Sequence, residues 1–478
     1  MNSKLIDDIR KELDSGNITS DDLFLDAVSK AHKYQDEYNC FVTIMDKKEE
    51  MESDSLLRGI CYGLKDNIST KGMLTTGSSN ILKDYIPLYD ATVYEKLKKA
   101  GAVLVGKTVL DELAMGGTGT TGHTGIVRNP WDKSRMIGGS SSGSAAAVAL
   151  GIVPFSIGSD TGDSIRKPAA YGGVVGFKPT YGRVSRYGLF PFATSLDHVG
   201  VIARSVKDIS YVMDEIKGHD DRDMTSLPDE DIKYVDNINN DVKGKRLFYI
   251  KEALENNSNS EELKAIIDNF NDVIEKARSL GFSVSEVSVD RRLLESINPV
   301  YNVISCAEAT SNNSNLTGIS FGNRINGDNV NDIMMKTRTN GFSELIKRRF
   351  VIGSYVLEKD NIDKLYLNAC RVRRLIVDKF NSLFEEYDGL IMPTTQCIAP
   401  KFGDVSDKLS DDYLILGNHL IIGNFGGYPS ISIPSGFVND MPVSVNITGK
   451  AMDDSLILNM ANVLEDGLGY KGQVSKHE

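Results

Sequence analysis

The sequence predicts an α/β fold, because short apolar runs alternate with small-residue turns and helical segments over most of its length. Two observations carry this prediction. An alanine-rich helical stretch at residues 144–150 lies between apolar runs at 102–106 and 152–157. Residues 247–287 have the pattern strand, helix, strand, with the helix at about 260–280, which is typical of a β-α-β unit. At 478 residues, the chain is long enough to bury a sizeable core.

Residues 1–58 are predicted to form a helical N-terminal segment. Before Gly16 breaks the pattern, apolar residues recur at helical spacing, at Leu5, Ile6, Ile9 and Leu13. Ser20 can cap a second helix, because its hydroxyl can accept a hydrogen bond from a backbone N–H of the first turn. Residues 48–58 are polar and charged, which predicts an exposed connection to the rest of the chain.

Residues 59–478 are predicted to form a single domain. Late apolar runs predict further strands at residues 389–393, 431–434 and 443–447. Two polar stretches interrupt the pattern: residues 217–245 predict an exposed loop, and the Asn-rich residues 311–340 predict an irregular segment. Because strand and helix patterns continue on both sides of these stretches, one interrupted domain is favoured over two independent ones.

The composition argues against several classes of protein. A net charge of −12 argues against binding of nucleic acid by this chain alone, since phosphates require a basic surface. There is no apolar run suited to a signal peptide or a membrane span, and no HExxH, clustered Cys/His or Walker A motif, so we expect neither a metal site nor an ATP site. Five scattered cysteines predict reduced thiols in a cytoplasmic protein: Cys40, Cys61, Cys306, Cys370 and Cys397.

Three segments contain residues suited to catalysis. Lys65 follows an apolar, strand-like segment, residues 138–144 form a Gly/Ser run that contains Ser140, and Ser164 lies in a second glycine-flanked run. A lysine and two such serines can form a hydrolytic relay without histidine, provided that the lysine is desolvated enough to be neutral. Ser164 also fits the cap of a helix, and both interpretations can hold, since a helix N-terminus supplies N–H groups for an oxyanion.

Two other interpretations of the Gly/Ser run are open. A flexible linker is disfavoured, because the run leads directly into an apolar small-residue helix. The run also fits the G-x-S-x-G nucleophile elbow, with His419 as the candidate histidine. That motif requires a strand immediately before it, and residues 132–136 do not resemble one.

These segments resemble the amidase signature family: Lys65 in GLKDNI, Ser140 in GGSSSGSAAAVA and Ser164 in GSDTGDSIRKPAAYGG. The resemblance runs from about residue 60 to the C-terminus. It implies a large mixed β-sheet sandwiched between helices, and it implies catalytic roles for Lys65, Ser140 and Ser164. Ser164 would be the nucleophile, and Ser140, after a cis peptide bond, would bridge it to neutral Lys65. The resemblance also implies an oxyanion hole made by backbone N–H groups of Thr161, Gly162, Asp163 and Ser164.

Further segments resemble the branch of this family that supplies ammonia to tRNA-dependent amidotransferases, including residues 111–116, 192–197 and 218–226. That resemblance implies glutamine as the substrate, with Tyr301 and Arg349 binding it, since an arginine fork suits a carboxylate. It implies a heterotrimer with two partners, designated B and C. The B partner uses ATP and Mg²⁺ to convert Glu-tRNA(Gln) to Gln-tRNA(Gln), and the C partner holds the other two together. The alternatives are a free-standing amidase acting on another small amide, or a weakly active structural subunit.

The sequence also departs from the family pattern at several positions. Asp163 replaces a glycine of the oxyanion loop, where an inward carboxylate would repel a developing oxyanion. Ser142 replaces another glycine, Gly172 replaces a common cysteine, and Thr120 replaces a glutamate. Near residue 418, Asn418 is the candidate substitute for the aspartate that holds the glutamine amino group. These departures concern amide-donor specificity and efficiency.

Overall fold

A single eleven-stranded sheet organises the molecule in the order β1-β3-β2-β4-β6-β5-β10-β11-β9-β7-β8. The computed structural model describes residues 1–478 except 50–51, 230, 256–259, 405–418 and 476–478. The strands are β1 (Phe41–Ile44), β2 (Cys61–Lys65), β3 (Val103–Thr108), β4 (Phe155–Asp160), β5 (Val175–Lys178), β6 (His198–Ala203), β7 (Arg246–Ile250), β8 (Ser283–Val287), β9 (Gly389–Pro393), β10 (Ser430–Val438) and β11 (Met441–Thr448).

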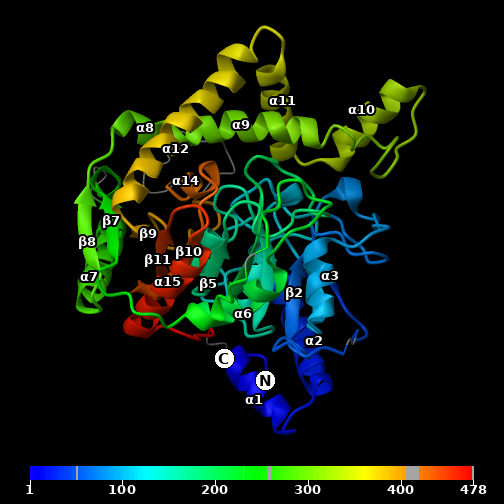
Figure 1. The fold of residues 1–478 in the computed structure, drawn as a ribbon. Helices are drawn as coiled ribbons and strands as arrows, with labels where there is room; N and C mark the ends of the chain where they lie inside the picture. Colours follow the sequence, from blue (N-terminus) through cyan, green and yellow to red (C-terminus); the bar gives the residue numbers. More distant parts are fainter. Residues whose placement is uncertain (50–51, 230, 256–259, 405–418, 476–478) are drawn as a thin grey trace.

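Helices lie on both sides of the sheet and beyond its ends (Figure 1). They are α1 (Ile6–Asp14), α2 (Ser20–Tyr38), α3 (Thr92–Lys99), α4 (Ser142–Ala149), α5 (Arg166–Gly172), α6 (Val206–Ile216), α7 (Glu261–Ser279), α8 (Arg291–Glu295), α9 (Ile297–Asn312), α10 (Val330–Gly341), α11 (Glu344–Leu357), α12 (Asn368–Glu386), α14 (Leu420–Phe425) and α15 (Asp454–Leu468). At the top of Figure 1, α9 packs against α11 and α12. Both chain ends lie at the bottom of that view, where Ser475 N–H donates to the Ala149 carbonyl.

The sheet is mixed, as expected, and its parallel part brings the catalytic candidates together. β2 runs parallel to β3 on one side and to β4 on the other. Lys65 is the last residue of β2, and Asp160 is the last residue of β4. Because parallel neighbours end at the same edge of a sheet, Lys65 and the loop after Asp160 lie at one edge.

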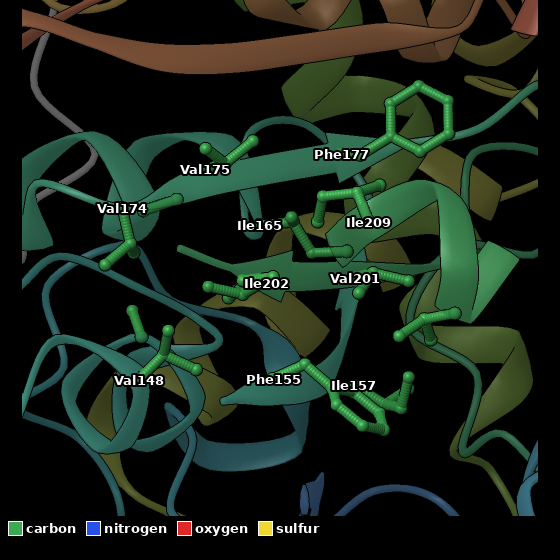
Figure 2. Close-up of a cluster of buried hydrophobic side chains, with 14 of the residues drawn as sticks. Val148, Phe155, Ile157, Ile165, Val174, Val175, Phe177, Val201, Ile202 and Ile209 are labelled. Atoms are coloured by element: carbon green, nitrogen blue, oxygen red, sulfur yellow. The ribbon is translucent and has the colours of Figure 1, made fainter. Parts of the chain in front are cut away.

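A buried hydrophobic cluster holds the residue that follows Ser164 in this loop. Figure 2 shows Ile165 among side chains from α4, β4, β5 and β6, including Val148, Phe155, Val175 and Val201. Ile165 is fully buried and follows Ser164 directly. Removing such a side chain from water stabilises its position by about 2–3 kcal/mol, so the core holds the backbone next to Ser164.

The strongly patterned elements are confirmed. The predicted strand at 389–393 is β9, and the predicted strands at 431–434 and 443–447 lie within β10 and β11. The β-α-β unit is β7, α7 and β8, with its two strands parallel. The predicted helix at 144–150 corresponds to α4 within one or two residues.

Three expectations were wrong in part. Residues 1–58 are not only helical, because β1 pairs antiparallel with β3 at the sheet edge. Residues 217–245 are irregular but not simply exposed: Tyr234, Ile238 and Val242 are buried, and Tyr234 N–H donates to Asp214 Oδ1 at 2.7 Å. Within residues 311–340, α10 is regular, and the Asn329 side chain caps it. These elements are short or bury few apolar side chains, so their periodic signal is weak.

Candidate active site

Lys65 lies fully buried among hydroxyl groups. Its Nζ donates to Ser140 Oγ at 2.8 Å, to Ser141 Oγ at 2.9 Å and to Ser159 Oγ at 2.9 Å. It also lies 3.2 Å from the Ser159 carbonyl oxygen. Within the described chain, no carboxylate forms an ion pair with Lys65. The lysine therefore has polar partners but no fixed counter-charge in contact with it.

The environment of Lys65 favours the neutral amine. Burial lowers the pKa of Lys65 to about 7, and the more distant charges of Asp111, Asp160 and Asp197 only partly oppose this shift. Desolvation disfavours the charged form of a lysine because an ammonium ion loses its hydration. A large fraction of Lys65 is therefore neutral at neutral pH, and a neutral amine can accept a proton.

The Gly/Ser run is a tightly packed turn before α4 and not a linker. The Gly139–Ser140 peptide bond is cis, as the resemblance implies. A Cβ placed on Gly139 would lie 2.0 Å from Asp111 Oδ2, and one on Gly143 would lie 2.3 Å from the Cys40 carbonyl oxygen. Glycine is needed at both positions because only a bare Cα allows this approach.

Ser164 lies next to the Lys65–Ser140 pair. It follows β4, precedes α5 and is 5% exposed. The Ser141 backbone N–H donates to the Ser164 carbonyl oxygen at 3.1 Å, so the two serine segments are joined directly. Among the residues that the structure describes, the Ser140 and Ser164 hydroxyls form no hydrogen bond with each other. The sheet edge thus brings together all three predicted catalytic residues, with Ser140 bonded to Lys65.

Hydrogen bonds to a carbonyl and to a side chain anchor the predicted oxyanion loop, and its backbone N–H groups stay available for a ligand. Arg166 Nη2 donates to the Gly162 carbonyl at 2.8 Å, and Thr161 Oγ1 donates to Asp197 Oδ1 at 2.7 Å. The N–H groups of Gly162, Asp163 and Ser164 donate to no other residue in the described part of the chain. Several N–H groups without internal partners form a site that suits a negatively charged oxygen.

A buried ion pair below the loop provides this support. Arg166 Nη2 donates to Asp160 Oδ1 at 2.8 Å and to Asn424 Oδ1 at 2.7 Å, and Asp160 Oδ2 accepts from Ile165 N–H at 3.0 Å. Burial alone would raise the pKa of the Asp160 carboxyl, but the Arg166 guanidinium holds it well below its usual range. The two residues form a charged, hydrogen-bonded pair, and this pair fixes the loop that lies between Asp160 and Arg166.

Asp163, the departure in the oxyanion loop, forms an ion pair with Lys167 at the start of α5. Both side chains are partly exposed, at 22% for Asp163 and 18% for Lys167. A neighbouring ammonium offsets the repulsion that an unpaired carboxylate would exert on an oxyanion. The acidic substitution is therefore compensated locally.

Tyr301 lies in α9 and Arg349 in α11, within the helical layer, and Tyr301 reaches the loop. A Cβ placed on Gly162 would lie 3.1 Å from the Tyr301 hydroxyl oxygen, so the tyrosine ring packs on the oxyanion loop. Burial raises the pKa of Tyr301, and the charge of Arg349 opposes that shift. Arg349 Nη1 lies 3.9 Å from Cys306 Sγ, and its guanidinium lies 5.6 Å from the centre of the Phe192 ring.

The remaining departures have separate positions. Ser142 Oγ donates to the Val109 carbonyl at 3.4 Å, and Thr120 Oγ1 bonds with Thr118 Oγ1 at 2.7 Å. A Cβ on Gly172 would meet only ordinary contacts, the nearest 3.4 Å away on Ile137. Asn418 lies outside the described residues.

The nucleophile-elbow interpretation finds no support in the geometry. Ser141, the central serine of that pattern, accepts from Lys65 and donates to the Ser159 carbonyl at 3.1 Å. In the described chain, residues 132–138 include no strand, whereas the elbow requires one immediately before the serine. His419 lies just before α14 and is buried.

Sequence reasoning missed the roles of Ser141, Ser159 and Asp197 at this site. Ser159 precedes the last residue of β4, and Lys65 ends the parallel neighbour β2, so strand pairing is the signal that would have found it. Asp197 accepts from the backbone N–H groups of Phe192 and Ala193 as well as from Thr161. Burial raises the pKa of Asp197 to about 6, although these hydrogen bonds oppose the shift.

The described residues contain neither a metal-binding cluster nor a membrane span. No group of three or more His, Cys, Asp or Glu side chains within the described ranges is arranged to hold a metal ion. Of the helices that the structure describes, none has the length and apolar character needed to cross a membrane.

Known proteins are similar to this chain in sequence, and a solved structure is similar to it in fold. A protein of Lactobacillus acidophilus, named as the A subunit of glutamyl-tRNA(Gln) amidotransferase, is 40% identical over 467 residues, covering 96% of this chain and 95% of that protein. A protein of the same name from Sulfolobus acidocaldarius is 38% identical over 473 residues, covering 96% and 98%. The crystal structure of the Thermotoga maritima protein of that name is 32% identical, with a TM-score of 0.83 and coverage of 100% and 98%.

A family model described as Amidase matches residues 22–458. This range contains the Lys65 strand, both serine segments and the helices that contribute Tyr301 and Arg349. With most of its length matched and with relatives of about 40% identity, the chain belongs to the amidase family.

Proposed function

We propose that this chain is the glutamine-hydrolysing component of a tRNA-dependent glutamyl-tRNA(Gln) amidotransferase. The observation that carries the chemistry is the buried Lys65, which is 2.8 Å from Ser140 Oγ and has a pKa of about 7. The substrate assignment rests on relatives that carry the amidotransferase name over almost their full length.

The proposed reaction begins with attack of Ser164 Oγ on the side-chain amide carbon of glutamine. The Ser164 proton passes to Ser140, whose own proton passes to Lys65, so that Lys65 becomes an ammonium ion. The Ser140 hydroxyl is hydrogen-bonded to Lys65 and not to Ser164. One serine side chain therefore rotates when substrate binds, so that the two hydroxyls can exchange a proton. The amide nitrogen of the tetrahedral intermediate then takes up the proton returned from Lys65 through Ser140, the C–N bond breaks, and the nitrogen leaves as ammonia. Water hydrolyses the glutamyl ester to glutamate in the same manner.

The groups around the serines have distinct proposed roles. The backbone N–H groups of residues 161–164 (Thr161, Gly162, Asp163 and Ser164) would stabilise the oxyanion. The Asp160–Arg166 pair would hold the loop that carries these N–H groups. Tyr301 and Arg349 would bind the glutamine carboxylate and backbone, since a guanidinium matches the two oxygens of a carboxylate. The position of Tyr301 beside Gly162, and the charge of Arg349 acting on Tyr301, support this assignment.

The ammonia would be consumed by partner proteins in a heterotrimer. In this proposal, the B partner uses ATP and Mg²⁺ to activate mischarged Glu-tRNA(Gln) in the cytoplasm, and the C partner joins it to this chain. The net charge of −12 supports assigning tRNA binding to a partner. The alternative is a free-standing amidase, and an experiment with and without partners distinguishes it from an amidotransferase component.

The test measures glutamine hydrolysis by the purified chain, alone and with its two co-expressed partners. Ser164→Ala should abolish ammonia release, whereas Ser142→Ala is a matched control, because that hydroxyl makes only a 3.4 Å contact with the Val109 carbonyl. Partner-stimulated release that requires Ser164 would support the amidotransferase function. Equal activity without partners would favour a free-standing amidase, and no release from glutamine in either state would refute the proposed substrate.

A further inference from the structure

Asp111 is a buried carboxylate that no step above uses. It lies in the turn after β3 and is fully buried. Its Oδ1 accepts from the N–H groups of Thr120 at 3.1 Å and Thr121 at 3.2 Å, and from Thr121 Oγ1 at 2.9 Å. Its Oδ2 accepts from the N–H groups of Thr118 at 3.1 Å and Gly119 at 3.0 Å. Several N–H donors on one carboxylate favour its charged form.

The same residue contacts the peptide that carries Ser140. The Asp111 backbone N–H donates to the Ser140 carbonyl oxygen at 3.2 Å. The Asp111 carboxylate also lies against Gly139, since a Cβ there would be 2.0 Å from Oδ2. Asp111 therefore connects residues 118–121 to the Gly139–Ser140 peptide, and the Ser140 hydroxyl on that peptide accepts from Lys65.

The charge of Asp111 also acts on Lys65. Burial lowers the pKa of Lys65, and among the charges that oppose this effect Asp111 is the strongest, ahead of Asp160 and Asp197. In a low-dielectric interior, a negative charge near a lysine stabilises the ammonium form that appears when the lysine accepts a proton. Asp111 thus combines a backbone contact with Ser140, a side-chain contact with Gly139 and an electrostatic effect on Lys65.

We propose that Asp111 is a positioning residue for the relay: it holds the Ser140 peptide against residues 118–121 and stabilises Lys65 after proton transfer. This inference rests on the proposed serine hydrolysis but not on glutamine as the substrate. Asp111 does not touch the reacting atoms. It acts through Ser140 and Lys65.

The experiment compares Asp111→Asn with Asp454→Asn in the full chain with its partners. Asp454 is the control for loss of a buried carboxylate, because it is equally buried and accepts from the Thr180 N–H at 2.8 Å and hydroxyl at 2.6 Å. It also pairs with the buried Arg183 at 3.4 Å, so its substitution measures the general cost of removing a buried charge. We expect Asp111→Asn to lower kcat roughly tenfold to a hundredfold, by analogy with residues that support the ligands of a metal ion. The acid limb of its pH profile should move to lower pH, since Lys65 loses a charge that favours protonation.

A second readout separates this inference from the identity of the substrate. The rate at which a fluorophosphonate modifies Ser164 reports the relay directly, with Ser164→Ala as the blank, and its pH profile should shift in the same direction. If glutamine is not hydrolysed but the probe reacts, the proposed substrate fails and Asp111 is still tested. The inference is overturned if the acid limb of Asp111→Asn stays in place, if Asp454→Asn loses as much kcat, or if wild-type protein reacts with neither compound.

Discussion

Two buried lysines on adjacent strands, Lys65 and Lys107, differ in what surrounds the amine. β2 and β3 run parallel, with Lys65 opposite Thr108 and Leu64 opposite Lys107. Both lysines are fully buried, and burial lowers the pKa of both, to about 7 for Lys65 and about 8 for Lys107. Lys107 Nζ lies 3.6 Å from Asp66 Oδ1 and donates to the Ile68 carbonyl at 2.8 Å.

This difference teaches that burial alone does not make a lysine catalytic. Lys107 has the Asp66 carboxylate as a fixed counter-charge. The two hydroxyls that accept from it, Thr70 Oγ1 and Thr75 Oγ1, donate in turn to backbone carbonyls. Lys65 has three serine hydroxyls as partners, and a hydroxyl can both accept and donate. Of the two lysines, only Lys65 contacts a hydroxyl beside the Ser164 segment, so only Lys65 is placed to exchange protons with that nucleophile.

The largest expected effect follows removal of the Lys65 amine. Lys65→Met should lower kcat on the order of 10³-fold, because general base catalysis contributes about 10²–10⁴-fold. The variant should stay folded, since an apolar side chain replaces a desolvated amine. Ammonia release and thermal unfolding measure the two properties separately. Retention of more than a tenth of the activity would show that Lys65 is not the base.

Lys107→Met should affect stability instead of catalysis. It leaves the buried Asp66 carboxylate without its lysine, and breaking a buried pair costs about 3–5 kcal/mol. Urea unfolding would measure this loss, and kcat per folded molecule should stay within about threefold of wild type. A large drop in kcat with unchanged stability would show that Lys107 also acts in catalysis, contrary to the distinction drawn between the two lysines.

The pH dependence sharpens the comparison further. Lys65 must be neutral, so hydrolysis should rise through an apparent pKa of about 7 and fall about tenfold per pH unit on acidification below it. The folded-state pKa is below the ordinary value of 10.5, so the resulting loss of stability is complete below about pH 7 and relieved as pH rises towards 10.5. An acid limb near pH 10 would contradict the burial of a neutral amine.

The smallest expected effect concerns Asp163. Because Asp163 pairs with Lys167 at the partly exposed end of the loop, Asp163→Gly should change kcat by less than about fivefold, in line with the weak energies of exposed ion pairs. Steady-state kinetics would measure it. A rise of more than tenfold would mean that the Asp163 carboxylate opposes the oxyanion despite its lysine.

Local sequence patterns were sufficient for the α/β class and for strands with a continuous or alternating apolar pattern, such as β9 and β11. They were insufficient for β1, whose four residues are too few to show a period, and for α10, which buries little apolar surface. The buried residues of the segment at 217–245 were also missed, because they show no periodic pattern along the chain. Their contacts lie with α6, which precedes them, and not within a periodic segment.

The sequence by itself determined which residues are available for chemistry: a lysine after a strand-like segment and two serines in glycine-rich runs. Only the tertiary structure decided that Lys65 contacts Ser140, Ser141 and Ser159, which are 75, 76 and 94 residues away along the chain. It alone decided that Asp111 supports the Ser140 peptide and that the pKa of Lys65 falls to about 7. The physical reason is that desolvation and Coulomb interactions depend on distances in space, which local patterns do not encode.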